Sequence, residues 1–222
     1  MSKEIINKFH QQYYYSGVWA NDTKWMGIPV QKCPLDLWIY QELIFELRPD
    51  LIIETGTCYG GSALFMAHMC DLVGYGSIIT IDINSTNIRT KNNERIHYLN
   101  GSSIDDVILN TVAKHAKGRS IDIMANRFGN PPIIMVILDS DHSKDYVLKE
   151  MECYAPFVTK GSYMIVEDSD VNGHPICSDH GPGPAEAIIE FLKTHPEFEV
   201  DRSCEKFLMT QNPGGYLRKK TN

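Results

Sequence analysis

Acidic residues follow two apolar runs of the chain. The first run, 133–138, leads into the sequence Asp-Ser-Asp-His at 139–142, and the second, 163–166, leads into Glu167 and Asp168. Short runs rich in β-branched residues are typical of strands buried on both faces of a parallel sheet, and the carboxyl ends of such strands share one edge. Several carboxylates at one edge repel one another unless a cation lies among them. The spacing therefore predicts a metal site.

A glycine-rich turn follows an earlier apolar run. Residues 52–62 read IIETGTCYGGS, in which Gly56 and Gly60 let the backbone approach a ligand at the start of a helix. The glycine spacing differs from GxGxxG, and no Gly-Lys-Ser/Thr is present, so the turn matches neither a dinucleotide fingerprint nor a phosphate loop. Asp82 ends the next apolar run, where an acid can bind both hydroxyls of a ribose. Together the turn and this acid predict a cofactor that contains a nucleoside.

Short apolar runs that alternate with amphipathic stretches would position these residues. The pattern predicts βαβ units and a mainly parallel sheet flanked by helices. A flavodoxin-like or dinucleotide-binding domain has the same order of elements and stays open as an alternative. The expected strands cover 51–53, 77–81, 96–99, 133–138, 163–166, 197–201 and 206–210, and the expected helices 35–47, 62–73, 104–117, 143–154 and 185–194.

The chain is expected to hold one main domain, residues 49–222, behind an N-terminal helical cap or lid, residues 1–48. The cap is rich in aromatic residues, and the segment 169–184 is rich in turn formers. Long loops in compact domains are often functional, so cap and loop are the expected determinants of substrate specificity.

Composition narrows the class of protein. The 222 residues are 43% hydrophobic and carry a formal net charge of −7, with Lys and Arg scattered along the chain. This charge argues against nucleic acid as the substrate and favours a small molecule or a glycan. Six cysteines without a CxxC pair indicate reduced thiols, hence a cytoplasmic location. The N-terminal sequence predicts neither a signal peptide nor a membrane span.

Four motifs give the chain a family resemblance. They are Glu54-Thr-Gly-Thr with Gly60-Gly-Ser-Ala, Asp139-Ser-Asp-His, Glu167-Asp168, and the tail from Phe207 to Leu217. In this order, from about Trp25 to Arg218, they resemble the cephalosporin hydroxylase and rhamnosyl O-methyltransferase family. The resemblance implies a Rossmann-like class I methyltransferase fold with a seven-stranded sheet. It also implies S-adenosylmethionine as methyl donor, Mg²⁺ or another divalent cation, a sugar hydroxyl such as that of rhamnose as acceptor, and a homo-oligomer.

The resemblance also implies roles for individual residues. Asp139, Glu167 and Asp168 would bind the metal, and His142 would be the general base. Both acids at 167 and 168 can reach one ion only if the strand ends between them, because successive side chains of a strand point to opposite faces. One departure from the related catechol enzymes is the order Cys58-Tyr59, which those enzymes reverse. The residues expected to bind the cofactor are Glu54, Gly56, Cys58, Ser62, Asp82, Ser103 and Asp141.

Two other functions stay open. A hydroxylase or oxidoreductase is one, although an iron hydroxylase requires two histidines and a carboxylate at one metal, and only His142 lies near the acidic motif. The other is a non-catalytic adapter that uses the fold to bind a cofactor or a partner. An adapter has no need of the three acids and His142 together.

Overall fold

A seven-stranded sheet forms the centre of the protein in the computed structural model, which describes residues 2–90, 93–126 and 132–221. The strand order is β5-β4-β3-β6-β7-β9-β8, and pairing is parallel except that β9 runs antiparallel to both its neighbours. The predicted mainly parallel sheet is confirmed. The strands are β3 (Leu51–Thr55), β4 (Ser77–Asp82), β5 (Ile96–Asn100), β6 (Ile134–Leu138), β7 (Tyr163–Val166), β8 (Phe198–Val200) and β9 (Tyr216–Lys219).

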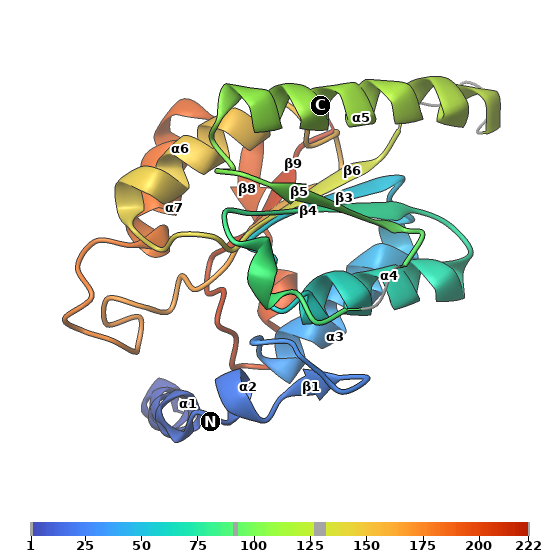
Figure 1. Cartoon of the computed structure of the whole chain (residues 1–222). Helices are drawn as coiled ribbons and strands as arrows, with labels where there is room; N and C mark the ends of the chain where they lie inside the picture. The colour runs from blue at the N-terminus through green and yellow to red at the C-terminus, as the bar shows by residue number, and fades with distance from the viewer. Residues whose placement is uncertain (1, 91–92, 127–131, 222) are drawn as a thin grey trace.

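Helices cover both faces of this sheet (Figure 1). One layer consists of α3 (Pro34–Leu47) and α4 (Gly61–Val73), and the other of α5 (Asp106–Asn126), α6 (Lys144–Tyr154) and α7 (Pro184–Thr194). Alternate residues of each strand enter the two cores. Ile52 packs with the α3 and α4 layer, whereas Leu51 and Ile53 pack with the other. All five residues of β3 are buried, as expected for a strand covered on both faces.

An N-terminal segment precedes α3. It comprises α1 (Lys3–Ser16), α2 (Val18–Asn21) and a hairpin of β1 (Lys24–Trp25) with β2 (Ile28–Pro29). Helix α1 lies against the loop that follows β7. His10 Nε2 lies 2.8 Å from Asp170 Oδ2, and Gln11 donates a hydrogen bond to the Pro175 carbonyl. The expected cap therefore contacts the expected specificity loop.

The strand predicted over 206–210 is wrong. This segment follows the short 3-10 helix η2 (Arg202–Glu205), and Leu208 has a positive φ of 71°, which ends any extended run. Thr210 and Gln211 instead bind the Asp36 carboxylate of α3 through a side-chain and a backbone hydrogen bond. The last strand is β9, beyond a turn at Gly214. Helix α5 is also longer than the 104–117 predicted.

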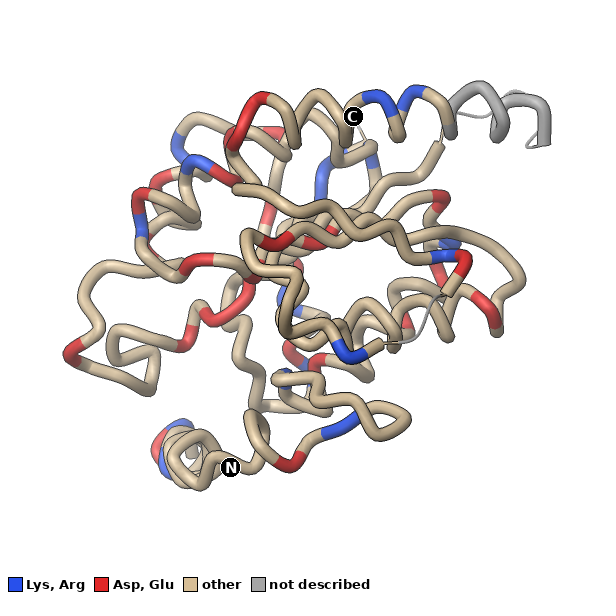
Figure 2. The backbone as a smooth tube through the Cα atoms, viewed as in Figure 1, with Lys and Arg blue, Asp and Glu red and all other residues tan. Residues whose placement is uncertain are grey.

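The remaining sequence expectations concern the surface and the thiols. All six cysteines, each in a described part of the chain, are free thiols. Lys and Arg are spread over several elements in Figure 2 and do not gather on one of them. Within the described residues, no helix combines the length and the apolar character needed to cross a bilayer.

Candidate active site

A cavity of about 180 Å³ opens at the carboxyl edge of the sheet. It is lined by the residues that follow four neighbouring strands, β3 to β6, so one ligand there contacts segments far apart in the chain. The lining residues are Gly56, Ile81, Asp82, Ile83, Gly101, Ser103, Ser140, Asp141 and Tyr146. Open α/β sheets bind their ligands at this edge.

The turn after β3 passes very close to the end of β6. Gly56 has a φ of +85°, and a Cβ built there would lie 1.8 Å from the carbonyl oxygen of Asp139. Glycine is thus required at this position for two reasons: the positive φ, and the lack of space for a side chain. The result is that the glycine turn and the acidic motif meet, which sequence spacing alone does not reveal.

Asp82 lies at the end of β4 and lines the cavity. Its two carboxylate oxygens accept hydrogen bonds from the backbone N–H groups of Cys58 and Asn84, each at 2.8 Å. The carboxylate is therefore held in one orientation beside the cavity. Cys58 contributes its backbone here, while its Sγ lies 2.8 Å from Gln31 Oε1.

Glu54 and Ser62 lie behind the glycine turn rather than on the cavity wall. Glu54 is fully buried and accepts hydrogen bonds from Ser62 Oγ at 2.5 Å and Thr80 Oγ1 at 2.7 Å. Burial raises the pKa of Glu54 to about 7, against the lowering effects of Lys32 and these two hydroxyls. In this structure, Glu54 ties β3, β4 and the start of α4 together.

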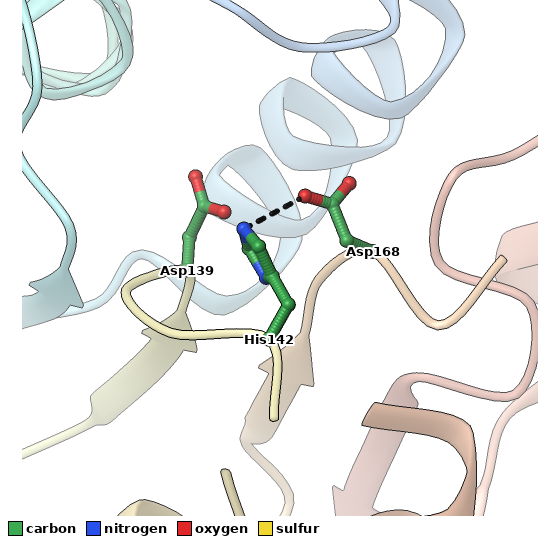
Figure 3. Close-up of side chains that lie close together, drawn as sticks. All are labelled: Asp139, His142 and Asp168. Atoms are coloured by element: carbon green, nitrogen blue, oxygen red, sulfur yellow. Dashed lines mark ion pairs between the residues drawn. The ribbon is translucent and has the colours of Figure 1, made fainter. Parts of the chain in front are cut away.

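Asp139, His142 and Asp168 converge at the ends of β6 and β7 (Figure 3). One possible ligand atom from each lies within 4.8 Å of the others, and His142 Nε2 is 3.3 Å from Asp168 Oδ2. Asp139 follows β6 and Asp168 follows β7, as the two parallel strands end side by side. This is the convergence of acids expected from the sequence.

The chain turns between the two neighbouring acids Glu167 and Asp168. Strand β7 ends at Val166, and Asp168 has a positive φ of 53°. The break allows both side chains to face the same region, the condition that the sequence set for a shared ion. In this structure Asp168 pairs with His142, whereas Glu167 points to a lysine.

That lysine, Lys32, lies between β2 and α3 and did not figure among the residues expected at the site. Its Nζ donates to Asp139 Oδ2 at 2.6 Å and to Glu167 Oε1 at 2.5 Å. The same Glu167 oxygen accepts a hydrogen bond from Tyr40 Oη at 2.6 Å. The excess of acidic residues in the sequence indicates that a cation lies among them. It does not indicate which lysine, if any, supplies the charge.

Charge interactions shift the pKa values of this cluster. Burial raises the pKa of Glu167 to about 7, and repulsion from Asp139 acts in the same direction. Burial disfavours a charged His142, yet attraction by Asp168 and Asp139 outweighs it and raises the pKa of the imidazole above 6.5. His142 is therefore placed where it can accept a proton in the neutral pH range.

The segment 139–142 joins the cavity to the acidic cluster. Asp139 and His142 belong to the cluster, and Ser140 and Asp141 between them line the cavity. Asp141 Oδ1 accepts hydrogen bonds from the backbone N–H and the hydroxyl of Ser143, so it shapes the approach to α6. Asp141 thus lies on the cavity wall, where a cofactor-binding residue is expected.

The structure brings four of the seven expected cofactor residues to the cavity wall. These are Gly56, Asp82, Ser103 and Asp141, while Glu54, Cys58 and Ser62 support the turn behind it. Tyr146 was missed: its hydroxyl lies 2.9 Å from Ser102 Oγ and 3.1 Å from Ser103 Oγ at the cavity wall. A tyrosine in the first turn of a helix carries no sequence signal for such a role.

The strand order and the cavity at the carboxyl edge define a Rossmann-like, class I methyltransferase fold. Solved structures share it: CmcI-N160 without ligand matches with a TM-score of 0.68 and 20% identity, over 90% of this chain and 77% of that one. CmcI-D160 with Mg and SAM matches with a TM-score of 0.65, also at 20% identity, over 89% of this chain and 76% of that one.

Sequence comparison is more specific. The family model for Rhamnosyl O-methyltransferase/CmcI matches residues 17–220, and the chain belongs to this family. Rhamnosyl O-methyltransferase of Mycobacterium bovis is 36% identical, over 97% of this chain and 85% of the relative. The Mycobacterium leprae protein of the same name is also 36% identical, over 97% of this chain and 91% of the relative. The family expected from the four motifs is confirmed.

Proposed function

We propose that the protein is an S-adenosylmethionine-dependent, Mg²⁺-dependent O-methyltransferase that methylates a sugar hydroxyl. The observation that carries the proposal is the segment 139–142, whose two outer residues belong to the cluster with Asp168 and whose two inner residues line the cavity. In a methyl transfer the donor and the acceptor must bind next to each other, and this segment places the cavity beside the cluster. The names of the mycobacterial relatives favour rhamnose, or another deoxysugar of a glycan, glycolipid or natural product, as the acceptor.

The cavity residues fit the methyl donor. Asp82 presents a fixed carboxylate that suits the two hydroxyls of a ribose, and Ser103 and Tyr146 lie where an adenine would be flanked. Gly56 lies on the cavity wall, where its backbone would contact the amino acid portion of the donor. When bound, S-adenosylmethionine supplies a methyl group on a positively charged sulfur.

The acidic cluster fits a hard divalent cation. Asp139 and Asp168 belong to the cluster with His142, and Glu167 shares Lys32 with Asp139. These three acids offer the carboxylate oxygens that Mg²⁺ prefers, and we assign the metal to them. Bound Mg²⁺ would lower the pKa of the acceptor hydroxyl and orient it. We expect Glu167 to bind the metal while it keeps its hydrogen bonds with Lys32 and Tyr40.

His142 is the residue that we assign to proton removal. Its Nε2 faces Asp168 and Asp139, and its side chain is 34% exposed, so an acceptor can approach it. With the donor bound, the acceptor oxygen would receive its methyl group, and His142 would take the hydroxyl proton. Asp168 stabilises the imidazolium that results.

Helix α1 and the loop after β7 are the proposed acceptor-selecting elements. Besides the contacts of His10 and Gln11, the Tyr15 hydroxyl accepts a hydrogen bond from the Cys177 backbone N–H. We further propose that residues 1–48 act as a cap on the domain 49–222, and that the protein works in the cytoplasm as a homo-oligomer. The acceptor would be a small molecule or a glycan rather than nucleic acid.

The test is a methylation assay with S-adenosylmethionine, Mg²⁺ and a panel of rhamnosides and deoxysugar nucleotides, with products identified by mass spectrometry. We expect one acceptor class to gain a single methyl group, and chelation to abolish the gain. Absence of donor binding by calorimetry in the presence of Mg²⁺ would contradict the proposal.

Two variants of the experiment address the other functions. Oxidation of a substrate by the anaerobically iron-loaded protein would favour a hydroxylase instead, although the cluster of described residues contains one histidine with two aspartates. Asp139→Ala separates enzyme from adapter. An enzyme loses turnover, whereas an adapter keeps its partner binding.

A further inference from the structure

Lys32 is a lysine whose side chain is only 1% exposed. A buried ammonium group is destabilising unless it is paired with good geometry. Lys32 is paired twice, with Asp139 on β6's end and Glu167 on β7's end, at 2.6 and 2.5 Å. It therefore bridges the ends of two parallel strands where their carboxylates converge, and it lies two residues before α3 begins.

The surroundings of Lys32 explain why the acids do not push each other apart. Glu167 is 5% exposed and receives only one further donor from the described residues, the Tyr40 hydroxyl. Glu54, also fully buried, attracts Lys32 as well. Without the lysine, Asp139 and Glu167 would face each other as two carboxylates in a poorly solvated place, which is strongly unfavourable.

The positive charge of Lys32 also affects how strongly the acids can bind a cation. When ionised, Asp139, Glu167 and Asp168 carry three negative charges, and Lys32 offsets one of them. With His142 neutral, as its role as proton acceptor requires, the remainder matches one divalent cation. Lys32 also occupies one oxygen of Asp139 and one of Glu167, so any cation bound there must share these carboxylates with it.

We infer that Lys32 is a built-in countercation of the acidic centre. It keeps Asp139 and Glu167 together in the absence of metal, and it weakens divalent-cation binding so that the metal exchanges. The inference rests on the proposed metal site for its second half only. Lys32 is in this sense a positioning residue, because it acts through the two acids.

The test compares thermal unfolding and metal affinity of wild type with Lys32→Met, in which methionine fills most of the space without the charge. In the presence of a chelator we expect Lys32→Met to be markedly less stable than wild type. Added Mg²⁺ should stabilise the variant far more than it stabilises wild type. Mg²⁺ or Mn²⁺ affinity, measured by calorimetry, should rise roughly tenfold or more. Lys144→Met is the matched control, since Lys144 pairs with Glu190 on the surface and should change neither quantity.

A double variant keeps the test decisive if Lys32→Met does not fold without metal. Lys32→Met/Glu167→Gln removes the lysine and one facing carboxylate together, and we expect it to fold in chelator with more stability than Lys32→Met. Failure of the double variant to recover stability would overturn the inference. So would an equal loss for Lys32→Met with and without Mg²⁺, or an unchanged or weaker metal affinity.

Failure of the proposed function gives a different result. If wild type binds no divalent cation at all, the metal site is refuted. The recovery of stability by the double variant in chelator still decides whether Lys32 holds the two acids together.

Discussion

Neighbouring residues of the acidic motif have different partners, and this decides what each can do. Asp168 faces His142 across 3.3 Å, whereas Glu167 is held by Lys32 and Tyr40. The positive φ of Asp168 makes the separation possible. At this scale the function depends on which side chain an acceptor can reach. His142 and Asp168 are more exposed than Lys32 and Glu167.

Replacing His142 by alanine should lower kcat by roughly 10²–10⁴, because the acceptor hydroxyl would lose its general base. Donor affinity should stay unchanged, since His142 belongs to the cluster and not to the cavity wall. Steady-state kinetics and calorimetry with S-adenosylmethionine measure the two quantities. His115→Ala on α5 is the control and should retain full turnover; a His142→Ala enzyme that does the same would exclude the proposed role.

Gly56→Ala should disrupt the site and the fold together. The added methyl would lie 1.8 Å from the carbonyl oxygen of Asp139, so the end of β6 must move. Gly27→Ala is matched in backbone conformation, at φ +86°, but has open space around it and should cost only about 1–2 kcal/mol. Urea unfolding compares them. Equal losses of stability would show that conformation alone, and not the contact with Asp139, makes Gly56 necessary.

The residues of the site differed in how well the sequence could predict them. Asp82, Asp139, His142 and Asp168 follow apolar strands, and a strand end places its residues at a known edge. Lys32 lies in a connecting segment that shows no hydrophobic periodicity. Its position at the site therefore depends on tertiary packing and could not be predicted from the sequence. Glu54 follows the same strand-end logic, but its neighbours Ser62 and Thr80 turn it inward.

Helix α3 links the cap, the sheet and the C-terminal segment. Its buried Asp36 accepts hydrogen bonds from Thr210 Oγ1, the Gln211 backbone N–H and Tyr216 Oη. These bonds hold residues 210–216 as a loop and strand end beside α3. The predicted strand at 206–210 was wrong for this reason: an apolar run favours a strand locally, but a buried carboxylate on another element captures the backbone.

Asp36 should make stability depend on pH. Burial raises its pKa from 3.8 to about 6, against the lowering effect of its hydrogen bonds. The folded state therefore binds this proton more tightly than the unfolded chain does. The resulting stabilisation is full below about pH 4 and is lost as the pH rises through about 6.

Asp36→Asn isolates this contribution, because asparagine does not titrate. We expect wild type to gain stability relative to the variant as the pH falls from 6 to 4, by on the order of 2–3 kcal/mol, since one pKa unit corresponds to about 1.4 kcal/mol. Chemical denaturation across this pH range measures the difference. A gap that stays constant with pH would mean that Asp36 titrates normally.

Elements with a clear period were predictable, and those fixed by distant contacts were not. Strands β3, β4, β6 and β7 are apolar runs buried on both faces, so their composition alone identifies them. Helix α1 has a partly exposed surface and contacts the loop after β7 through a few hydrogen bonds. Its helical state could not be read from a segment rich in aromatic and polar residues.

At the scale of the molecule, the sheet gathers distant segments around one cavity. The ends of β3, β4, β5 and β6 each contribute to its wall, and these strands are adjacent in the sheet. Both cores extend over the same strands, because alternate residues of each strand enter opposite layers. A ligand in the cavity therefore binds only when the central strands and their connections are folded.

S-adenosylmethionine should raise the unfolding temperature of the whole domain for this reason. A ligand at about 100 times its Kd adds about 2.7 kcal/mol when it binds the folded state alone. For a domain of this size that corresponds to an increase of roughly 5–11 °C. Differential scanning calorimetry with and without the donor measures it. Asp82→Ala removes the fixed carboxylate at the cavity and should abolish most of the increase, whereas Glu190→Ala, on the surface of α7, should leave it intact. An increase that survives in Asp82→Ala would place the donor outside this cavity.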